Sequence, residues 1–185
     1  MTSDSEAGWL AGVARCESPN CDARPEGSEV NLVVVHAITL PPERFGGEGI
    51  AQLFTNRLEP DEHPYYEQIC ELRVSAHFLI RRDGALVQFV PTRMRAWHAG
   101  ASSWRGREAC NDFSIGIELE GCDTLPFEAA QYRSLAKLID VLRASHAIEA
   151  VVGHSEIAPG RKTDPGPCFD WERLLSALDR PLARA

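Results

Sequence analysis

Residues 31–36, which read NLVVVH, constrain the fold more than any other stretch of this chain. The apolar residues from Leu32 to Val35 would leave an extended strand apolar on both faces, so the run predicts a buried, central strand of a sheet. The run ends at His36. A histidine at the carboxyl end of a buried strand is a common position for a site in α/β sheets, and a core histidine with a satisfied hydrogen bond is the alternative.

Further strands and two helices are predicted along the chain. Residues 75–80 and 86–90 read as two strands, with a strong hairpin signal at Asp83-Gly84 between them. Residues 151–152 read as the last strand. A helix is predicted to open at Pro126, where a missing N–H costs little, and its apolar stripe comprises Leu135, Leu138, Ile139 and Leu142. A final helix follows Asp170 as its N-cap, with a buried face made by Trp171, Leu174, Leu175 and Leu178.

Residues 113–120 form an alternating strand with one unusual face. Alternation gives one face that is apolar throughout, comprising Phe113, Ile115, Ile117 and Leu119. The other face carries Ser114, Gly116, Glu118 and Glu120. Two carboxylates on one face of a central strand are costly unless they have partners or a chemical role. An exposed edge strand is the alternative.

Residues 40–71 differ in character from the rest of the chain. They carry Pro41-Pro42, Gly46-Gly47, Pro60 and Pro64, with a weak helical patch at residues 50–57. A long segment interrupted by prolines and glycines predicts an excursion that covers a cleft. A plain surface insertion is the alternative. We expect fraying at residues 1–6 and 181–185. No internal repeat or domain boundary is visible.

Composition excludes several classes of function. The chain has 185 residues, enough for one domain with a sizeable core, and its 44% hydrophobic and 25% charged residues are ordinary for a globular protein. A formal net charge of −8 without a long basic run argues against nucleic acid and anionic membrane surfaces as partners. The first six residues are polar and acidic rather than basic and apolar, so we expect a cytoplasmic protein.

The stretch 151–170, VVGHSEIAPGRKTDPGPCFD, gathers reactive side chains. Gly153 lets the backbone turn, so that His154 lies where a strand leaves the core. Lys162 and Asp164 would leave an extended segment on the same face, and Pro165-Gly166 predicts a chain reversal directly after them. A surface loop whose histidine and aspartate cap turns is the alternative explanation.

The strand ends together predict a metal site. The chain has no H-E-x-x-H motif, no glycine-rich phosphate loop and no G-x-S-x-G elbow. His36, His154 and Asp164 remain, with Glu118 and Lys162 close by in any compact sheet. Two histidines and one carboxylate that leave a coordination position open suit a zinc hydrolase.

Five longer motifs carry a family resemblance. They are VVVHAITLPP, VSAHFLIRRDG, RAWHAG, CNDFSIGIELEG and GHSEIAPGRKTDPGPCFDW. In this order they resemble the AmpD-type 1,6-anhydro-N-acetylmuramyl-L-alanine amidases, over about residues 8–171. The wider relatives are peptidoglycan recognition proteins and phage lysozyme-type amidases. The resemblance implies an α/β fold with a central mixed β-sheet flanked by helices, as one peptidoglycan-recognition-protein-like amidase domain over residues 1–185. This agrees with the strands and helices predicted above.

The resemblance also assigns roles to individual residues. It implies one zinc ion per chain, held by His36, His154 and Asp164. It implies that Glu118 is the catalytic acid and base and that Lys162 stabilises the oxyanion. The residues implied to line the substrate cleft are Arg73, Trp97, His98 and Asn111. One departure is Ala37, because the family usually has asparagine after the first zinc histidine, and this puts one polar contact beside the metal in doubt.

The implied reaction cleaves the amide bond between the lactyl group of 1,6-anhydro-N-acetylmuramic acid and L-alanine, during cytoplasmic recycling of peptidoglycan. The expected partner is a small anhydro-muropeptide, with no nucleic acid, no membrane and no obligate protein partner. A protein that binds muropeptides without cutting them is one alternative, which the complete ligand set and Glu118 disfavour. A zinc amidase of polymeric cell wall is another, which the absence of a signal sequence disfavours.

The cysteines give a first testable prediction. The chain has six, at positions 16, 21, 70, 110, 122 and 168, without a C-x-x-C pair. In a long chain without a secretory signal we expect free thiols. Thiol titration under denaturing conditions and without reductant should find six free groups. Two or more missing thiols in fresh protein would count against a reducing environment.

Overall fold

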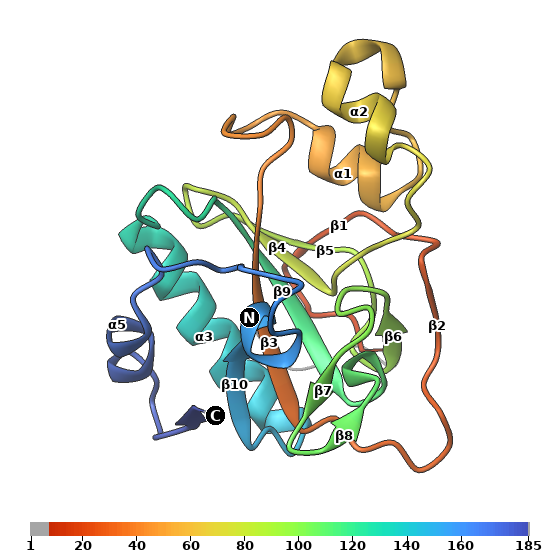
Figure 1. Ribbon diagram of the computed structural model, residues 1–185. Helices are drawn as coiled ribbons and strands as arrows, with labels where there is room; N and C mark the ends of the chain where they lie inside the picture. The colour runs from red at the N-terminus through yellow and green to blue at the C-terminus, as the bar shows by residue number, and fades with distance from the viewer. Residues whose placement is uncertain (1–7, 185) are drawn as a thin grey trace.

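A computed structural model of the protein describes residues 8–184, so the fraying expected at residues 1–6 lies outside the described range. Within that range, seven strands form one sheet in the order β1-β5-β4-β9-β3-β10-β11 (Figure 1). β4 and β5 are antiparallel, and the other neighbouring pairs of this sheet are parallel. The predicted α/β fold with a central mixed sheet and flanking helices is confirmed. The strands, in sheet order, are Ala14–Arg15, Leu86–Gln88, Phe78–Ile80, Ser114–Glu120, Leu32–Ile38, Ala150–Gly153 and Ala183–Arg184.

Two strands with long parallel pairing form the centre of this sheet. β3 (Leu32–Ile38) lies between β9 and β10, as its apolar run predicts, although it continues two residues beyond His36. β9 (Ser114–Glu120) lies between β3 and β4, and every one of its residues is buried. The alternative of an exposed edge strand for residues 113–120 is therefore wrong, and the two carboxylates of β9 are inside the protein.

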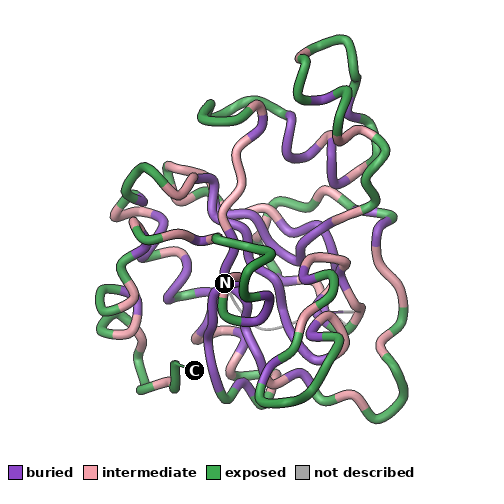
Figure 2. The backbone as a smooth tube through the Cα atoms, viewed as in Figure 1, coloured by how far each residue is buried: buried purple, intermediate pink, exposed green. Residues whose placement is uncertain are grey.

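Helices α3 (Ala129–Ser145) and α5 (Trp171–Ser176) cover one face of the sheet (Figure 1). The predicted apolar positions of both helices pack there against the alternating apolar residues of β3 and β9, which are Val33, Val35, Ile115, Ile117 and Leu119. Each such side chain contributes roughly 1.5–3 kcal/mol when it is fully buried. Burial is concentrated in these central strands and in the inner side of α3 (Figure 2).

The helix boundaries correct one prediction and confirm another. α3 does not open at Pro126: its N-cap is Glu128, whose N–H donates to Oε1 of Gln131 at 2.9 Å. This reciprocal capping, rather than the proline, sets the first turn. Asp170 is the N-cap of α5, as predicted, and its carboxylate accepts from the N–H of Arg173 at 2.9 Å. None of the helices within residues 8–184 is long and apolar enough to cross a bilayer.

The opposite face of the sheet is covered mostly by short elements. These are the β7–β8 hairpin (Ser103–Trp104 and Arg107–Glu108), the 3-10 turn Cys110–Asp112 and α4 (His154–Ile157). Trp104, Cys110 and Ile157 pack there on even-numbered positions of β3 and β10. β2 (Cys21–Ala23) and β6 (Met94–Ala96) form a second small antiparallel sheet beside them. This face also carries the even-numbered polar residues of β3 and β9.

The predicted excursion of residues 40–71 is a packed lobe at the carboxyl end of β3 (Figure 1). It contains α1 (Gly49–Phe54), the 3-10 turn Pro60–Glu62 and α2 (Pro64–Ile69). Its apolar side chains form one cluster with residues from β4 and the strand after it, and the members from the lobe are Leu40, Ile50, Ala51, Leu53, Phe54, Leu58 and Tyr66. The segment is therefore part of the core and not a loose insertion.

Glu120 ties this lobe to the sheet. Its side chain is 2% exposed. Oε1 accepts from the N–H of Gly46 at 2.6 Å, and Oε2 accepts from the N–H of Arg82 at 3.1 Å. One of the two carboxylates on the polar face of β9 is thus fully used in structure, which leaves the other for chemistry.

The carboxyl end differs from the prediction of a frayed tail. Ala183–Arg184 form β11, which pairs in parallel with β10. The guanidinium of Arg184 stacks 4.4 Å from the ring of Trp171 and lies 3.6 Å from a carboxylate oxygen of Glu156. The main chain of β10 would otherwise present an unpaired edge, and these contacts hold the added strand against it. Ala185 lies outside the described residues.

The anchoring role of Glu120 predicts a stability effect. In Glu120→Gln, an NH₂ group replaces one of the two acceptor oxygens and faces a main-chain N–H, so one buried donor loses its partner. We expect the free energy of unfolding to fall by about 1–3 kcal/mol. Urea denaturation measures this, with exposed Glu29 as the control in Glu29→Gln. An unchanged denaturation midpoint in Glu120→Gln would contradict the anchor.

Candidate metal centre

The register of the parallel strands places three polar residues in one row. His36 of β3 lies directly opposite Glu118 of β9. Val35 pairs with Gly153 of β10. The next residue, His154, therefore lies at the level of His36, on the side of β3 away from β9. All three residues are at the carboxyl ends of parallel strands, where side chains of α/β sheets converge on ligands.

Three ligand atoms meet at one point beside this row. Nδ1 of His36 lies 2.9 Å from Nδ1 of His154. Oδ2 of Asp164 lies 3.2 Å from the first nitrogen and 3.1 Å from the second. Ligands held about 2.0–2.1 Å from a tetrahedral metal ion are roughly 3.3 Å apart, so this spacing fits one metal ion. Within residues 8–184, His36, His154 and Asp164 each offer a ligand atom, and these atoms all lie within 4.8 Å of one another.

The loop that carries Asp164 is tied back to α4. The main-chain N–H of Ser155 donates to the carbonyl of Asp164 at 2.9 Å. The N–H of Gly166 donates to the carbonyl of Thr163 at 3.0 Å, which closes the chain reversal predicted at Pro165-Gly166. These bonds hold the carboxylate of Asp164 beside His154, which lies ten residues earlier in the chain. The alternative of a surface loop with turn-capping side chains is wrong for His154, which is buried.

The charge states of the ligand residues suit a cation. Burial lowers the pKa of His36 to about 4, so its imidazole is neutral near pH 7. Burial alone would raise the pKa of Asp164, but its contacts with His154 and His36 outweigh this and hold the pKa below its usual range. A neutral imidazole and an ionised carboxylate are the forms that bind divalent metal ions. Neutral His36 and ionised Asp164 are therefore suited to hold a metal ion.

A cavity of about 300 Å³ lies beside the three ligand residues, and Glu118 and Lys162 line it as well. Glu118 is 8% exposed, and its Oε2 has no hydrogen-bond partner among the described residues. Burial raises the pKa of Glu118 well above its ordinary value, the charge of Asp164 adds to this, and Lys162 opposes it. A buried carboxylate oxygen without a partner, facing a cavity, is ready to accept a proton.

The predicted substrate residues divide into two groups. His98 lines the cavity with the metal ligands. Arg73, Trp97 and Asn111 are not among its lining residues. Arg73 is exposed and donates to the carbonyl of Cys70 at 3.1 Å, and the indole N–H of Trp97 donates to Asp22 at 3.2 Å. Asn111 accepts from the main-chain N–H groups of residues 98 and 99 at 3.2 and 2.8 Å.

Sequence reasoning did not identify the apolar wall of the cavity. It comes mainly from the lobe and the residues after it, and comprises Leu40, Leu53, Phe54, Tyr65, Ile69, Leu72 and Val74. The prolines and glycines of residues 40–71 predict that this segment covers a cleft. They do not indicate which of its side chains line the cavity. Ser114 was also given no role, although its place on the face of Glu118 was predicted. Its Oγ lies 3.1 Å from Nε2 of His98.

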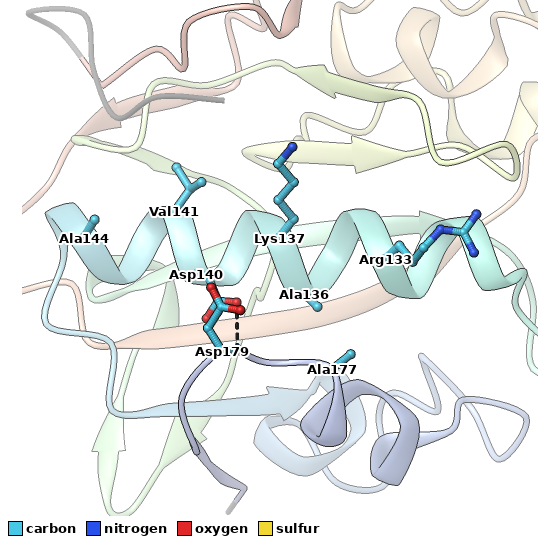
Figure 3. A pocket seen from close by; sticks show the side chains of 8 residues that line it. All are labelled: Arg133, Ala136, Lys137, Asp140, Val141, Ala144, Ala177 and Asp179. Atoms are coloured by element: carbon cyan, nitrogen blue, oxygen red, sulfur yellow. Dashed lines mark hydrogen bonds between the residues drawn. The ribbon is translucent and has the colours of Figure 1, made fainter.

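A second polar hollow adjoins the metal ligands, and a third hollow lies elsewhere. The second shares Ala37, Thr39, Lys162 and Asp164 with the first, so the two form a continuous cleft over the ligand atoms. The third lies on the helical side, where Asp140 of α3 accepts from the N–H of Asp179 at 3.0 Å (Figure 3). It contains no histidine or cysteine and belongs to the face opposite the metal ligands.

Comparison with known proteins agrees with this geometry. A family described as N-acetylmuramoyl-L-alanine amidase matches residues 26–167. The chain is 56% identical over 175 residues to 1,6-anhydro-N-acetylmuramyl-L-alanine amidase AmpD of Salmonella typhimurium (strain SL1344), which covers 94% of each chain.

Two solved structures are also similar. A crystal structure of a selenomethionine derivative of AmpD superimposes with a TM-score of 0.92 at 54% identity, over 95% of this chain and 99% of that one. The amidase AmiD of Escherichia coli, in complex with the substrate anhydro-N-acetylmuramic acid-L-Ala-D-γ-Glu-L-Lys, superimposes with a TM-score of 0.59 at 30% identity, over 83% of this chain and 60% of that one.

The ligand geometry predicts the effect of removing one donor. His154→Ala leaves two of three ligand atoms, so we expect purified protein to lose its bound metal. Elemental analysis by mass spectrometry after dialysis measures the metal content per chain. His63→Ala is the control, since His63 caps α2 in the lobe and does not line the cavity. Full metal occupancy in His154→Ala would rule out His154 as a ligand.

Proposed function

Because the chain belongs to the N-acetylmuramoyl-L-alanine amidase family, we propose that it hydrolyses the amide bond between the lactyl group of 1,6-anhydro-N-acetylmuramic acid and L-alanine of muropeptides. One observation carries the proposal: three metal-ligating atoms converge beside Glu118, whose buried Oε2 has no partner among the described residues. The coverage of 94% of an AmpD chain at 56% identity supports the choice of substrate.

The metal in this proposal is one zinc ion per chain, held by His36, His154 and Asp164. Two imidazoles and one carboxylate are a zinc ligand set that leaves a coordination position open for catalysis. Zinc, when bound, supplies Lewis acidity that polarises the amide carbonyl and acidifies water.

Glu118 is the proton carrier of the reaction. Its carboxylate lies on the strand next to His36, directly opposite it in register, and lines the same cavity. It takes a proton from the attacking water and delivers it to the leaving amine of L-alanine. Burial raises the pKa of Glu118, which makes its carboxylate a stronger base towards water than an exposed glutamate.

Lys162 stabilises the negative charge that develops on the carbonyl oxygen. It lines both parts of the cleft that meet over the ligand atoms. Ala37, where the family usually has asparagine, also lines both parts and offers no polar side chain there. Contacts of the substrate with Arg73, Trp97, His98 and Asn111 stay predictions.

The remaining parts of the proposal concern the setting of the reaction. We expect the chain to act as a single amidase domain in the cytoplasm, in the recycling of peptidoglycan, without an obligate protein partner. The ligand is a small anhydro-muropeptide, which the substrate bound by AmiD of Escherichia coli supports. The net charge of −8 disfavours nucleic acid and anionic membranes as partners.

One experiment separates the proposed reaction from its two alternatives. The protein is incubated with purified anhydro-muropeptide and, separately, with intact sacculi, and the products are identified by mass spectrometry. We expect free peptide from the muropeptide and little from sacculi. Binding of the muropeptide without cleavage would point to a recognition protein, and preferred release from sacculi would point to an amidase of polymeric wall.

The role of Glu118 predicts a kinetic effect. Glu118→Gln keeps the shape of the side chain but cannot accept the proton, so kcat should fall roughly 10²-fold or more. Zinc content and the melting temperature should change little. Steady-state kinetics with anhydro-muropeptide measures the loss.

Glu120→Gln is the matched comparison on the same face of β9. It should lower stability and leave kcat of the folded enzyme near normal, the reverse of Glu118→Gln. Near-normal turnover by Glu118→Gln would assign the proton transfer to another group. Loss of zinc from Glu118→Gln would make Glu118 a ligand.

A further inference from the structure

We propose that His98 and Ser114 form a hydrogen-bond relay that holds His36 in the single tautomer able to bind the metal. The relay runs from a main-chain carbonyl through a hydroxyl and one imidazole to the ligand histidine. His98 is then a positioning residue that acts through His36. This inference rests on the proposed zinc site.

The relay starts at Ser114, where the direction of the first bond is fixed. Oγ of Ser114 lies 2.6 Å from the carbonyl oxygen of Cys110. A carbonyl oxygen only accepts, so the hydroxyl donates its one proton there. Towards Nε2 of His98, at 3.1 Å, the same hydroxyl can therefore only accept. The proton of the neutral His98 ring is thus on Nε2, and its Nδ1 carries a lone pair.

The second half of the relay passes this constraint to His36. Nδ1 of His98 lies 2.9 Å from Nε2 of His36. Because the His98 nitrogen accepts, the proton of His36 is on Nε2 and its Nδ1 carries the lone pair. Nδ1 is the atom that lies beside His154 and Asp164. With the other tautomer, a proton would point at the metal position.

His154 is oriented by the residue next to His98. Its Nε2 lies 3.1 Å from the carbonyl oxygen of Ala99, so the proton is on Nε2 and Nδ1 is again free for the metal. Residues 98 and 99 therefore set the tautomers of both ligand histidines, one through a ring and the other through a carbonyl. Asn111 holds this pair of residues by accepting from both of their N–H groups.

The His98 ring packs directly on the main chain of the sheet. The ring lies against β9 at Gly116, and a Cβ atom at this position would overlap the ring. Ser114, Gly116 and Glu118 alternate on one face, so the serine acceptor, the space for the ring and the cavity carboxylate come from one strand. Both ring nitrogens of His98 are engaged, which leaves neither for a hydrogen bond to substrate.

The test compares two nearly isosteric variants, His98→Leu and His98→Asn. Asparagine can present Oδ1 near the position of Nδ1 and accept from His36, whereas leucine cannot. Zinc affinity is measured for each full-length protein by competition with a chromophoric chelator. We expect His98→Leu to bind zinc about 10–100-fold more weakly than wild type and His98→Asn to recover most of that loss. Equal affinity of His98→Leu and wild type, or equal losses in both variants, would overturn the relay.

A spectroscopic measurement tests the relay without a substitution at position 98. Long-range ¹H–¹⁵N correlation spectra of zinc-loaded wild-type protein report which nitrogen of His98 carries the proton. We expect the proton on Nε2 of His98, towards Ser114, and a proton on Nδ1 of His98 would overturn the inference.

The outcomes also separate the relay from the proposed function. If wild-type protein binds no zinc, the zinc site fails and the relay fails with it. If wild-type protein binds zinc and cleaves anhydro-muropeptide while His98→Leu binds zinc equally well, the relay alone is wrong.

Discussion

The pairing of β3 with β9 is the constraint on which the rest of the structure depends. It sets His36 opposite Glu118, with the odd-numbered apolar residues of both strands under α3 and with His36 and the polar residues of β9 on the opposite face. Side chains alternate with a period of two, so a slip of one residue in either strand would turn its polar row into the helical core. The apolar packing of Val33, Val35, Ile115 and Ile117 therefore fixes the chemistry on the opposite face.

Buried polar side chains of β9 on that face have defined partners, as is usual in protein interiors. Glu120 binds two main-chain N–H groups, and Ser114 joins the carbonyl of Cys110 to His98. Among the side chains of β3 and β9, the exception is Oε2 of Glu118, which lies beside the metal ligands. A buried polar atom without a partner is destabilising, so its retention at this place is best explained by a function that requires it.

Much of this arrangement follows from the sequence, and the remainder does not for a physical reason. The apolar run before His36 and the alternation of residues 113–120 predict the central strands, and the motifs predict the ligand residues. The roles of Ser114, Asn111 and Glu120 depend on distances between segments that are remote in sequence, so no local pattern could reveal them. The predicted start of α3 at Pro126 is wrong, because the capping by Glu128 and Gln131 sets the first turn. The predicted fraying of residues 181–185 is wrong for Ala183 and Arg184, because they pair with the free edge of β10.

The central claim is that one zinc ion is bound by two Nδ1 atoms and one carboxylate. Crystals of the zinc-loaded protein, with anomalous data collected above and below the zinc absorption edge, test it most directly. The account predicts one anomalous peak per chain, about 2.0–2.2 Å from Nδ1 of His36, Nδ1 of His154 and Oδ2 of Asp164. A peak at another place, or coordination through Nε2 of either histidine, would contradict it.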